Sequence, residues 1–234
     1  MRQFQALLFD FDGTLADTMG DHFRAWQAVM SEYGIRLAPE DYYPLEGVRV
    51  RELPGRFFAK HGQPPRDERV IVEKKERYYL AHHGVAFYPG VEAFIRQLQV
   101  RRVPIAMVTT GLADRVKQSV PRGFLEQFGA VVTGDETSEG KPSPAPYRLG
   151  AKRLGVPPEA CIVVENAPLG IESAKRAGTY CIALCTTLPR RELAQADEVL
   201  DAFDELREAP LVKQLLEATQ HGNPRELARR CGPP

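Results

Sequence analysis

Residues 7–15 read Leu-Leu-Phe-Asp-Phe-Asp-Gly-Thr-Leu, an apolar run that ends in two carboxylates, a glycine and a hydroxyl. A short apolar run bounded by turn residues is typical of a buried strand. In an extended chain Asp10 and Asp12 point to the same face. The carboxyl end of a strand is where an open α/β sheet binds its ligands. The stretch therefore predicts a strand followed by two acids suited to nucleophilic attack and proton transfer, or, on a plainer interpretation, by turn and cap residues.

The composition is that of an ordinary globular protein. Of its 234 residues, 43% are hydrophobic and 26% are charged, which fits one large domain or a core domain with a smaller insertion. Basic and acidic residues number 31 each, so no basic field favours nucleic acid. No apolar run is long enough to span a bilayer, and the N-terminus shows no signal-peptide pattern. We expect a cytoplasmic monomer or weak homodimer with no nucleic-acid or membrane partner.

The four cysteines are scattered, and three of them lie in or beside apolar, strand-like runs. This placement is typical of reduced, buried thiols, and it fits neither a disulfide framework nor a zinc site. The four positions are Cys161, Cys181, Cys185 and Cys231.

Hydrophobic periodicity separates a helical block from an alternating block. In residues 17–86, Phe23, Trp26 and Tyr33 recur at helical spacing, and no segment is convincing as a strand. Farther along, strands and helices alternate, which argues for a parallel sheet with helices on both faces. The expected strands span residues 4–11, 104–109, 130–133, 161–165, 180–184 and 198–200. The expected helices include residues 50–59, 66–83, 91–100, 113–120, 144–154, 169–177 and 211–219.

Polar groups follow four of the expected strands, at the edge where the carboxyl ends of parallel strands meet. Together they would supply an anionic nucleophile, a proton-transfer acid, hydroxyl donors, a fixed cation and oxygen ligands for a metal. Phosphoryl transfer needs such a set, because it depends on in-line positioning and on neutralising the charge of the transferred group. The groups are Asp10 and Asp12, Thr109 and Thr110, Lys141, and Glu165 with Asn166.

Taken singly, each of these groups also has a plainer interpretation. Thr109 or Thr110 can cap a helix, although a helix N-terminus also binds phosphate. A lysine in a loop, such as Lys141, is usually solvated, but the flanking prolines favour a positioned cation. Glu165 and Asn166 can cap the next helix. Only the ordered set of four is specific.

The four groups resemble the four motifs of the haloacid dehalogenase superfamily. Residues 140–147 and 165–178 are similar to its phosphoglycolate phosphatase and β-phosphoglucomutase branch. The resemblance covers roughly residues 4–205 and implies an α/β, Rossmann-like fold with a doubly wound parallel sheet. The core would comprise residues 1–16 and 87–221, with an inserted helical cap at 17–86. The remaining residues, 222–234, are polar and are expected to form a loose tail.

The resemblance also implies a mechanism with an aspartyl-phosphate intermediate. Asp10 would attack the phosphorus, and Asp12 would protonate the leaving oxygen and then activate water or an incoming hydroxyl. The phosphoryl oxygens would be held by Lys141 and by Thr109, with Thr110 as the alternative. The implied cofactor is Mg²⁺, which prefers oxygen ligands shared with a phosphate. Its implied ligands are Asp10, the backbone carbonyl of Asp12, Glu165 and Asn166.

The fourth motif departs from the family pattern, which usually has Glu-Asp where this chain has Glu165-Asn166. Asparagine offers a neutral carbonyl oxygen, so we expect weaker Mg²⁺ affinity and an intact reaction. Alternatively, Glu165 alone carries the acidic role, or the change marks a weakened or non-catalytic member.

Further residues resemble the cap of β-phosphoglucomutase. His22 and Trp26 have the spacing of its hinge histidine and tryptophan, although helical spacing favours Trp26 as a core residue. Arg49 and Arg51 follow a loop in which an expected lysine is replaced by Glu46. Lys75 lies in a charged helix. The basic residues would meet the distal part of an anionic substrate, or they form a solvated face. The candidate substrate contacts are His22, Arg49, Arg51 and Lys75.

These observations favour an Mg²⁺-dependent phosphatase of a small phosphorylated metabolite, such as a sugar phosphate or a phosphoglycolate-like acid. A mutase must hold a second phosphate in the cap, and Glu46 opposes a faithful copy of that site. A β-phosphoglucomutase-type phosphotransferase is therefore the second hypothesis. The third is a weakly active or non-catalytic phosphometabolite-binding protein, which Asn166 motivates.

Overall fold

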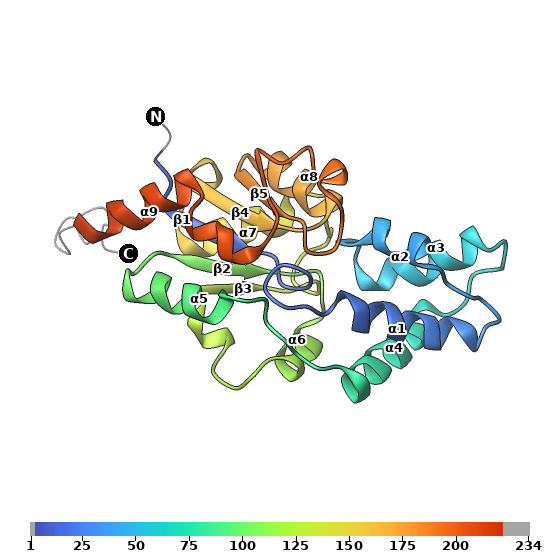
Figure 1. Ribbon diagram of the computed structural model, residues 1–234. Helices are drawn as coiled ribbons and strands as arrows, with labels where there is room; N and C mark the ends of the chain where they lie inside the picture. The colour runs from blue at the N-terminus through green and yellow to red at the C-terminus, as the bar shows by residue number, and fades with distance from the viewer. Residues whose placement is uncertain (1–2, 222–234) are drawn as a thin grey trace.

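A six-stranded parallel sheet forms the centre of the part of the chain that the computed structural model describes, residues 3–221 (Figure 1). The strand order is β3-β2-β1-β4-β5-β6, so the chain reverses its winding between β1 and β4. Ligands of doubly wound sheets bind at the carboxyl ends of the strands at such a reversal. The strands are β1 (Ala6–Phe9), β2 (Ile105–Val108), β3 (Ala130–Val132), β4 (Cys161–Glu165), β5 (Tyr180–Leu184) and β6 (Glu198–Leu200).

Helices cover both faces of the sheet, because successive side chains of each strand point to opposite faces. In β1, Leu7 and Phe9 belong to an apolar cluster that includes side chains of α5 and α9, whereas Ala6 and Leu8 pack with α7 and α8. All four of these β1 side chains are fully buried. The helices are α5 (Val91–Val100), α6 (Ala113–Ser119), α7 (Ala145–Leu154), α8 (Pro168–Ala177) and α9 (Pro210–His221).

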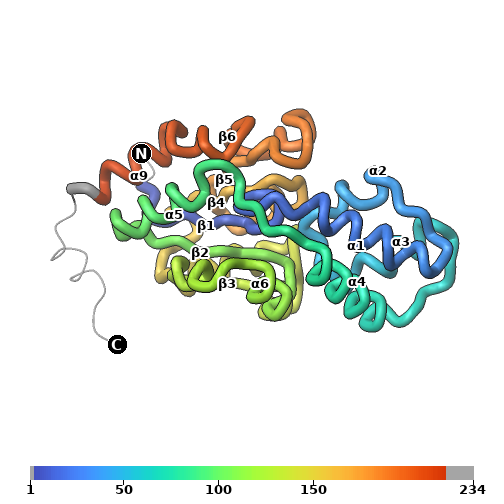
Figure 2. The backbone as a smooth tube through the Cα atoms, turned by 60° about the horizontal axis from the view of Figure 1, so that its bottom comes forward, coloured from blue at the N-terminus to red at the C-terminus, as the bar shows by residue number. Residues whose placement is uncertain are grey.

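Four helices between β1 and α5 form a separate helical lobe beyond one end of the sheet (Figures 1 and 2). The lobe has its own apolar cluster, in which Trp26 packs edge-on against Phe57. The lobe begins directly after the two acids that follow β1, so its position bears on the site. Its helices are α1 (Met19–Ser31), α2 (Pro39–Tyr42), α3 (Leu53–Lys60) and α4 (Glu68–His82). The boundaries at residues 17 and 86 stay a prediction.

The α/β fold with a doubly wound sheet is confirmed, and the differences from expectation are local. The strand expected over 4–11 ends at Phe9, because the carbonyl of Phe11 accepts backbone hydrogen bonds from the three residues that follow Gly13. The helix expected over 50–59 begins only at Leu53, after a 3₁₀ turn. Its second residue is a proline, which fits the first turn of a helix because it has no N–H to donate.

The cysteine prediction is confirmed in part. Cys161 and Cys181 are buried free thiols, but Cys185 is only half-buried because it follows the end of β5. Cys231 and the predicted loose tail lie outside the described residues.

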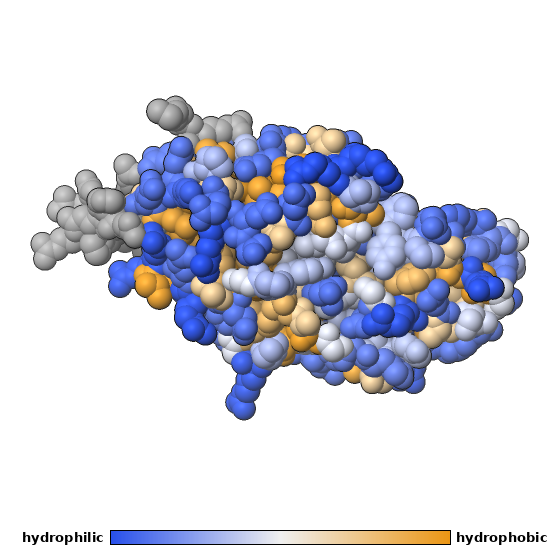
Figure 3. Space-filling view, viewed as in Figure 1, coloured by the Kyte–Doolittle hydropathy of each residue, from blue (hydrophilic) through white to orange (hydrophobic). Residues whose placement is uncertain are grey.

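The surface is largely hydrophilic on the face that Figure 3 shows. On the face shown in Figure 3, hydrophilic residues are widespread and apolar residues form small patches. Among residues 3–221, no helix combines the length and the apolar character needed to cross a membrane. The expected compartment and oligomeric state stay predictions.

Leu8→Ala should lower the free energy of unfolding by about 2–5 kcal/mol, because it opens a cavity where β1 meets α7. Leu8 is 0% exposed and lies against Gly150 of that helix. Urea unfolding followed by circular dichroism measures the change. The control is Val100→Ala at a side chain that is 79% exposed, which should stay within about 0.5 kcal/mol. Equal stabilities of the two variants would contradict the packing described for β1.

Candidate active site

A buried ion triad lies at the reversal point of the sheet. Asp10 directly follows β1, and Glu165 is the last residue of the neighbouring strand β4. The ammonium of Lys141 lies between them, 2.5 Å from Asp10 Oδ1 and 2.6 Å from Glu165 Oε1. All three side chains are at most 10% exposed. The structure thus brings together groups from the first, third and fourth predicted loops.

Tyr147 of α7 supports this triad and was not predicted. Its hydroxyl donates a hydrogen bond of 2.6 Å to Glu165 Oε1, and its ring centroid lies 5.0 Å from the Lys141 ammonium. Lys141 belongs to the loop that leads into α7, so this helix positions both residues. A tyrosine at helical spacing reads as a core residue, and the sequence carries no further signal of this contact.

The triad contains two acids and one base, and all three groups are buried. Burial raises the pKa of Asp10 to about 7, and the charge of Glu165 adds to this, although Lys141 opposes both. Burial alone would lower the pKa of Lys141, but the two carboxylates raise it above the ordinary lysine value. The lysine is therefore a fixed cation, and burial opposes the ionised form of Asp10.

Asp12 forms a bidentate ion pair with Arg115, a residue of α6 that the sequence interpretation missed. The guanidinium nitrogens lie 2.6 Å from Asp12 Oδ2 and 3.1 Å from Oδ1. Gly111 leaves room for this group, because a Cβ there would overlap the guanidinium. Although burial would raise the pKa of Asp12, Arg115 and His22 hold it well below its usual range. Asp12 is therefore ionised in this conformation.

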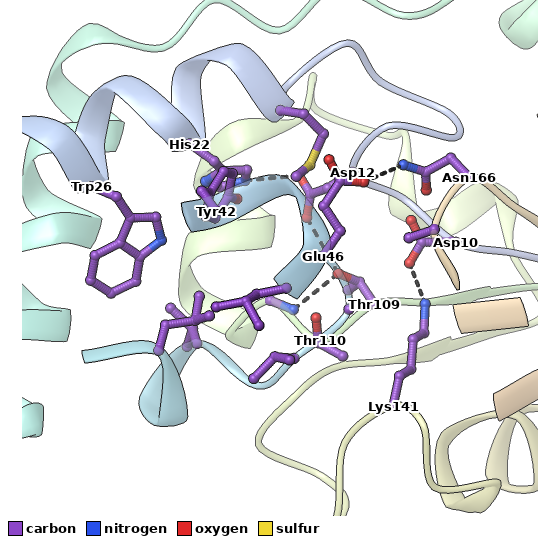
Figure 4. A pocket seen from close by; sticks show the side chains of 18 of the residues that line it. Asp10, Asp12, His22, Trp26, Tyr42, Glu46, Thr109, Thr110, Lys141 and Asn166 are labelled. Carbon is purple, nitrogen blue, oxygen red and sulfur yellow. Dashed lines mark hydrogen bonds and ion pairs between the residues drawn. The ribbon is translucent and has the colours of Figure 1, made fainter. Parts of the chain in front are cut away.

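His22, a predicted residue of the helical lobe, contacts Asp12 (Figure 4), and the predicted Lys75 contacts His22 in turn. His22 Nε2 lies 3.1 Å from Asp12 Oδ1, and His22 Nδ1 lies 2.8 Å from the ammonium of Lys75. Burial and the charge of Lys75 lower the pKa of His22 to about 4, so the ring is neutral. Because Lys75 donates to Nδ1, the Nε2–H of His22 donates to Asp12. Lys75 itself pairs with Glu76 at 3.1 Å.

Thr109 and Thr110 directly follow β2, but their contacts differ. Thr109 Oγ1 is 3.4 Å from Asp12 Oδ2 and accepts a 3.0 Å hydrogen bond from the backbone N–H of Gly111. Thr110 also lines the cavity, and its carbonyl packs against Gly134. Which threonine would contact a phosphate stays a prediction, with Thr109 favoured by its contact with Asp12.

Arg49 and Arg51 do not line the cavity, and their expected role as substrate contacts stays a prediction. The guanidinium of Arg49 donates to the carbonyl oxygens of Ser138, at 2.6 Å, and Gly134. Arg51 is exposed. Arg49 precedes a 3₁₀ turn at Val50–Glu52 that contains Arg51, and the sequence did not predict this turn.

Asn166 contacts the helical lobe through Glu46. Its amide Nδ2 donates to Glu46 Oε2 and to the hydroxyl of Thr187, each at 2.9 Å, while its Oδ1 accepts a 3.1 Å hydrogen bond from Thr14. Glu46 is 4% exposed, and its Oε1 has no hydrogen-bond partner. Burial raises the pKa of Glu46 to about 8, with contributions from Asp10 and Glu165, although Thr187 opposes the shift.

One cavity between the sheet and the helical lobe is lined by the acids Asp10, Asp12 and Glu165 and by the cations Lys75, Arg115 and Lys141, among other residues. The acids Asp10 and Asp12 lie on its core side, and Trp26 and Tyr42 lie on its lobe side (Figure 4). Trp26 therefore belongs both to the lobe's apolar cluster, as predicted, and to the cavity wall.

The donor set fits Mg²⁺ in its chemistry. Asp10, Glu165 and Asn166 offer side-chain oxygens beside the Asp12 backbone, and oxygen ligands are those that Mg²⁺ prefers. Burial raises the pKa of Asp10 and so opposes its ionised form, which a divalent cation nearby would favour. Within residues 3–221, no three His, Cys, Asp or Glu side chains converge as a metal site, so an ion would also need the amide and backbone oxygens.

Comparison with known proteins identifies the family. The model of the haloacid dehalogenase-like hydrolase family matches residues 7–184, and the chain belongs to this family. A validoxylamine A 7'-phosphate phosphatase from Streptomyces hygroscopicus subsp. limoneus is 32% identical over 206 residues, or 87% of this chain and 96% of that protein. Hexitol phosphatase A of Escherichia coli (strain K12) is 30% identical over 204 residues, or 86% and 93%.

A solved structure supports the same assignment. A mutant of CbbY from Rhodobacter sphaeroides, in complex with xylulose-(1,5)bisphosphate, is 31% identical and has a TM-score of 0.76. The match covers 87% of this chain and 96% of that chain. The predicted family and its α/β fold are thereby confirmed.

Arg115→Lys should lower kcat about tenfold to a hundredfold, with a smaller change in KM, because lysine keeps the charge but cannot hold Asp12 through a bidentate pair. Steady-state kinetics with a phosphomonoester that the wild type hydrolyses measures the effect. Lys117→Met changes an exposed residue of the same helix and should leave kcat unaltered. If Arg115→Lys keeps the wild-type kcat, Arg115 does not position Asp12 for the reaction.

Proposed function

We propose that this protein is a phosphatase that hydrolyses a small phosphomonoester through a phosphorylated Asp10. The observation that carries the proposal is the position of Asp10 after β1, beside Lys141 and next to Glu165 at the end of β4. Membership of the haloacid dehalogenase-like hydrolase family and the phosphatase relatives support it.

In the first half-reaction, a carboxylate oxygen of Asp10 attacks the phosphorus and the bond from phosphorus to the leaving oxygen breaks. Lys141, with Thr109 or Thr110, would bind phosphoryl oxygens and offset their charge. The leaving oxygen takes a proton, for which Asp12 is the nearest candidate donor. Arg115 and His22 favour the ionised form of Asp12. Asp12 must therefore take up a proton before it can donate one to the leaving oxygen.

In the second half-reaction, water attacks the phosphorus and the bond to Asp10 breaks. Ionised Asp12 accepts the proton of that water, and its environment suits this role. The helical lobe covers the cavity and would limit the access of other water during transfer. We propose residues 17–86 as a closing cap for this reason.

Mg²⁺ is the proposed cofactor, held by Asp10, the backbone carbonyl of Asp12, Glu165 and Asn166. It would supply positive charge that reduces the repulsion between the attacking carboxylate and the phosphate.

The proposed substrate class is a phosphorylated sugar or polyol with one phosphate. Two relatives are phosphatases whose names specify a hexitol and a phosphate ester of validoxylamine A. In this cavity Lys75 pairs with Glu76, and Arg115 pairs with Asp12, so both cations already have an acidic partner. A second phosphate would have to displace one of these partners. This consideration ranks the mutase second, although CbbY is known with a bound bisphosphate.

Asp10→Asn should lower phosphate release about 10⁴-fold or more on every substrate, because it removes the nucleophile. The assay is a panel of phosphomonoesters with Mg²⁺, including hexitol phosphates, phosphoglycolate and β-glucose 1-phosphate. Both inorganic phosphate and glucose 6-phosphate are followed, and chelation of Mg²⁺ is a second arm. Asp201→Asn, at a side chain that is 69% exposed, is the control and should retain activity.

The three hypotheses give different outcomes. Release of phosphate supports the phosphatase, whereas glucose 6-phosphate without release supports the mutase. Binding without either product supports the non-catalytic interpretation. Turnover that survives Asp10→Asn would overturn the mechanism as a whole.

A further inference from the structure

The contact between Glu46 and Asn166 joins the helical lobe to the core beside the nucleophile. Glu46 follows the 3₁₀ turn at residues 43–45, and Asn166 follows β4. Figure 4 shows both side chains facing one another near Asp10. Two donors from the core hold Glu46 Oε2, the amide of Asn166 at 2.9 Å and the hydroxyl of Thr187 at 3.1 Å. The lobe thus inserts a buried carboxylate into the wall of the core site.

This contact explains why position 166 can be an asparagine here. An aspartate of the same shape would place a carboxylate oxygen opposite that of Glu46, and close like charges repel. Gly13 packs directly against the Asn166 amide, so the side chain has little room to turn away. An amide at this position can donate a hydrogen bond to Glu46, whereas an ionised carboxylate cannot. Asparagine at 166 and glutamate at 46 are therefore complementary as hydrogen-bond donor and acceptor.

The charges of the site depend on where the lobe lies. The core alone contributes Asp10, Glu165 and Lys141, with a sum of one negative charge. Docking of the lobe adds Glu46 and makes the sum two negative charges. A divalent cation would bring this sum to zero, whereas with the lobe withdrawn it would leave one positive charge.

We propose that Glu46 brings to the metal site the negative charge that Asn166 does not supply, so that Mg²⁺ binding and docking of the helical lobe promote one another. The inference rests on the proposed Mg²⁺ site. The environment of Glu46 supports this proposal, because the residue is 4% exposed and its Oε1 has no hydrogen-bond partner. Burial of a carboxylate in this state is costly unless positive charge is near. Because linkage is reciprocal, whatever favours docking also raises the affinity for the ion.

The test combines Mg²⁺ titration by calorimetry with small-angle X-ray scattering, neither of which requires turnover. Both measurements are made at the same alkaline pH, at which carboxylates are ionised. In the wild type, Mg²⁺ should reduce the radius of gyration as the lobe docks. Glu46→Gln keeps the shape and one acceptor oxygen but loses the charge. We expect its Mg²⁺ affinity to fall about five- to tenfold and its radius of gyration to be independent of Mg²⁺.

Two further variants separate charge from damage to the fold. Glu46→Gln combined with Asn166→Asp returns a carboxylate to the core, so Mg²⁺ affinity should recover to the wild-type value or above while docking stays independent of the ion. Glu40→Gln removes an exposed acid of the lobe and should behave as the wild type in both measurements. Urea unfolding of each variant confirms that it is folded.

The outcomes distinguish this inference from the proposed function. Equal Mg²⁺ affinity in wild type and Glu46→Gln, or scattering that responds to Mg²⁺ in both, would overturn the coupling and leave the phosphatase standing. If the wild type binds no Mg²⁺ while phosphate release persists under chelation, the proposed metal site itself is wrong.

Discussion

The position of the Lys141 ammonium between Asp10 and Glu165 is the interaction on which the rest of the site depends. The two acids end up together because β1 and β4 pair in parallel at the reversal of the sheet. Two buried carboxylates at such a distance repel each other and resist ionisation, and a cation from a third loop makes the arrangement tolerable. The fold therefore places two mutually repelling carboxylates at the position of the nucleophile. Lys141 compensates only one of their two negative charges.

Asp12, two residues beyond the nucleophile, has partners from both parts of the molecule. Arg115 approaches from α6 of the core, whereas His22 approaches from α1 of the helical lobe. Arg115 of the core makes the larger contribution to keeping this carboxylate ionised, and His22 of the lobe adds to it. The lobe does more than cover the cavity, because it supplies part of the environment that prepares Asp12 to accept a proton.

The sequence predicts those features that depend on local patterns of apolar and polar residues. The apolar run before Asp10 predicted β1, and strand ends in a parallel sheet had to bring Lys141 and Glu165 to the same edge. Arg115 was missed, since a single arginine on a short polar helix has no sequence signature and its partner lies 103 residues away. Arg49 donates to the backbone carbonyl of Ser138, 89 residues away, and no sequence pattern indicates this contact. Side-chain direction depends on tertiary packing, which no local pattern specifies.

Asn166 shows why a departure from a family motif is poorly judged by itself. Taken alone, an amide in place of a carboxylate suggests a weaker metal site, since one negative charge is missing. In the folded chain the same amide donates to Glu46, a carboxylate that also departs from the expected lysine. The two changes leave the charge around Asp10 close to balanced in the presence of a divalent ion, but they move one carboxylate from the core to the lobe. The total charge of the docked site is then similar, and what changes is that it depends on the position of the lobe.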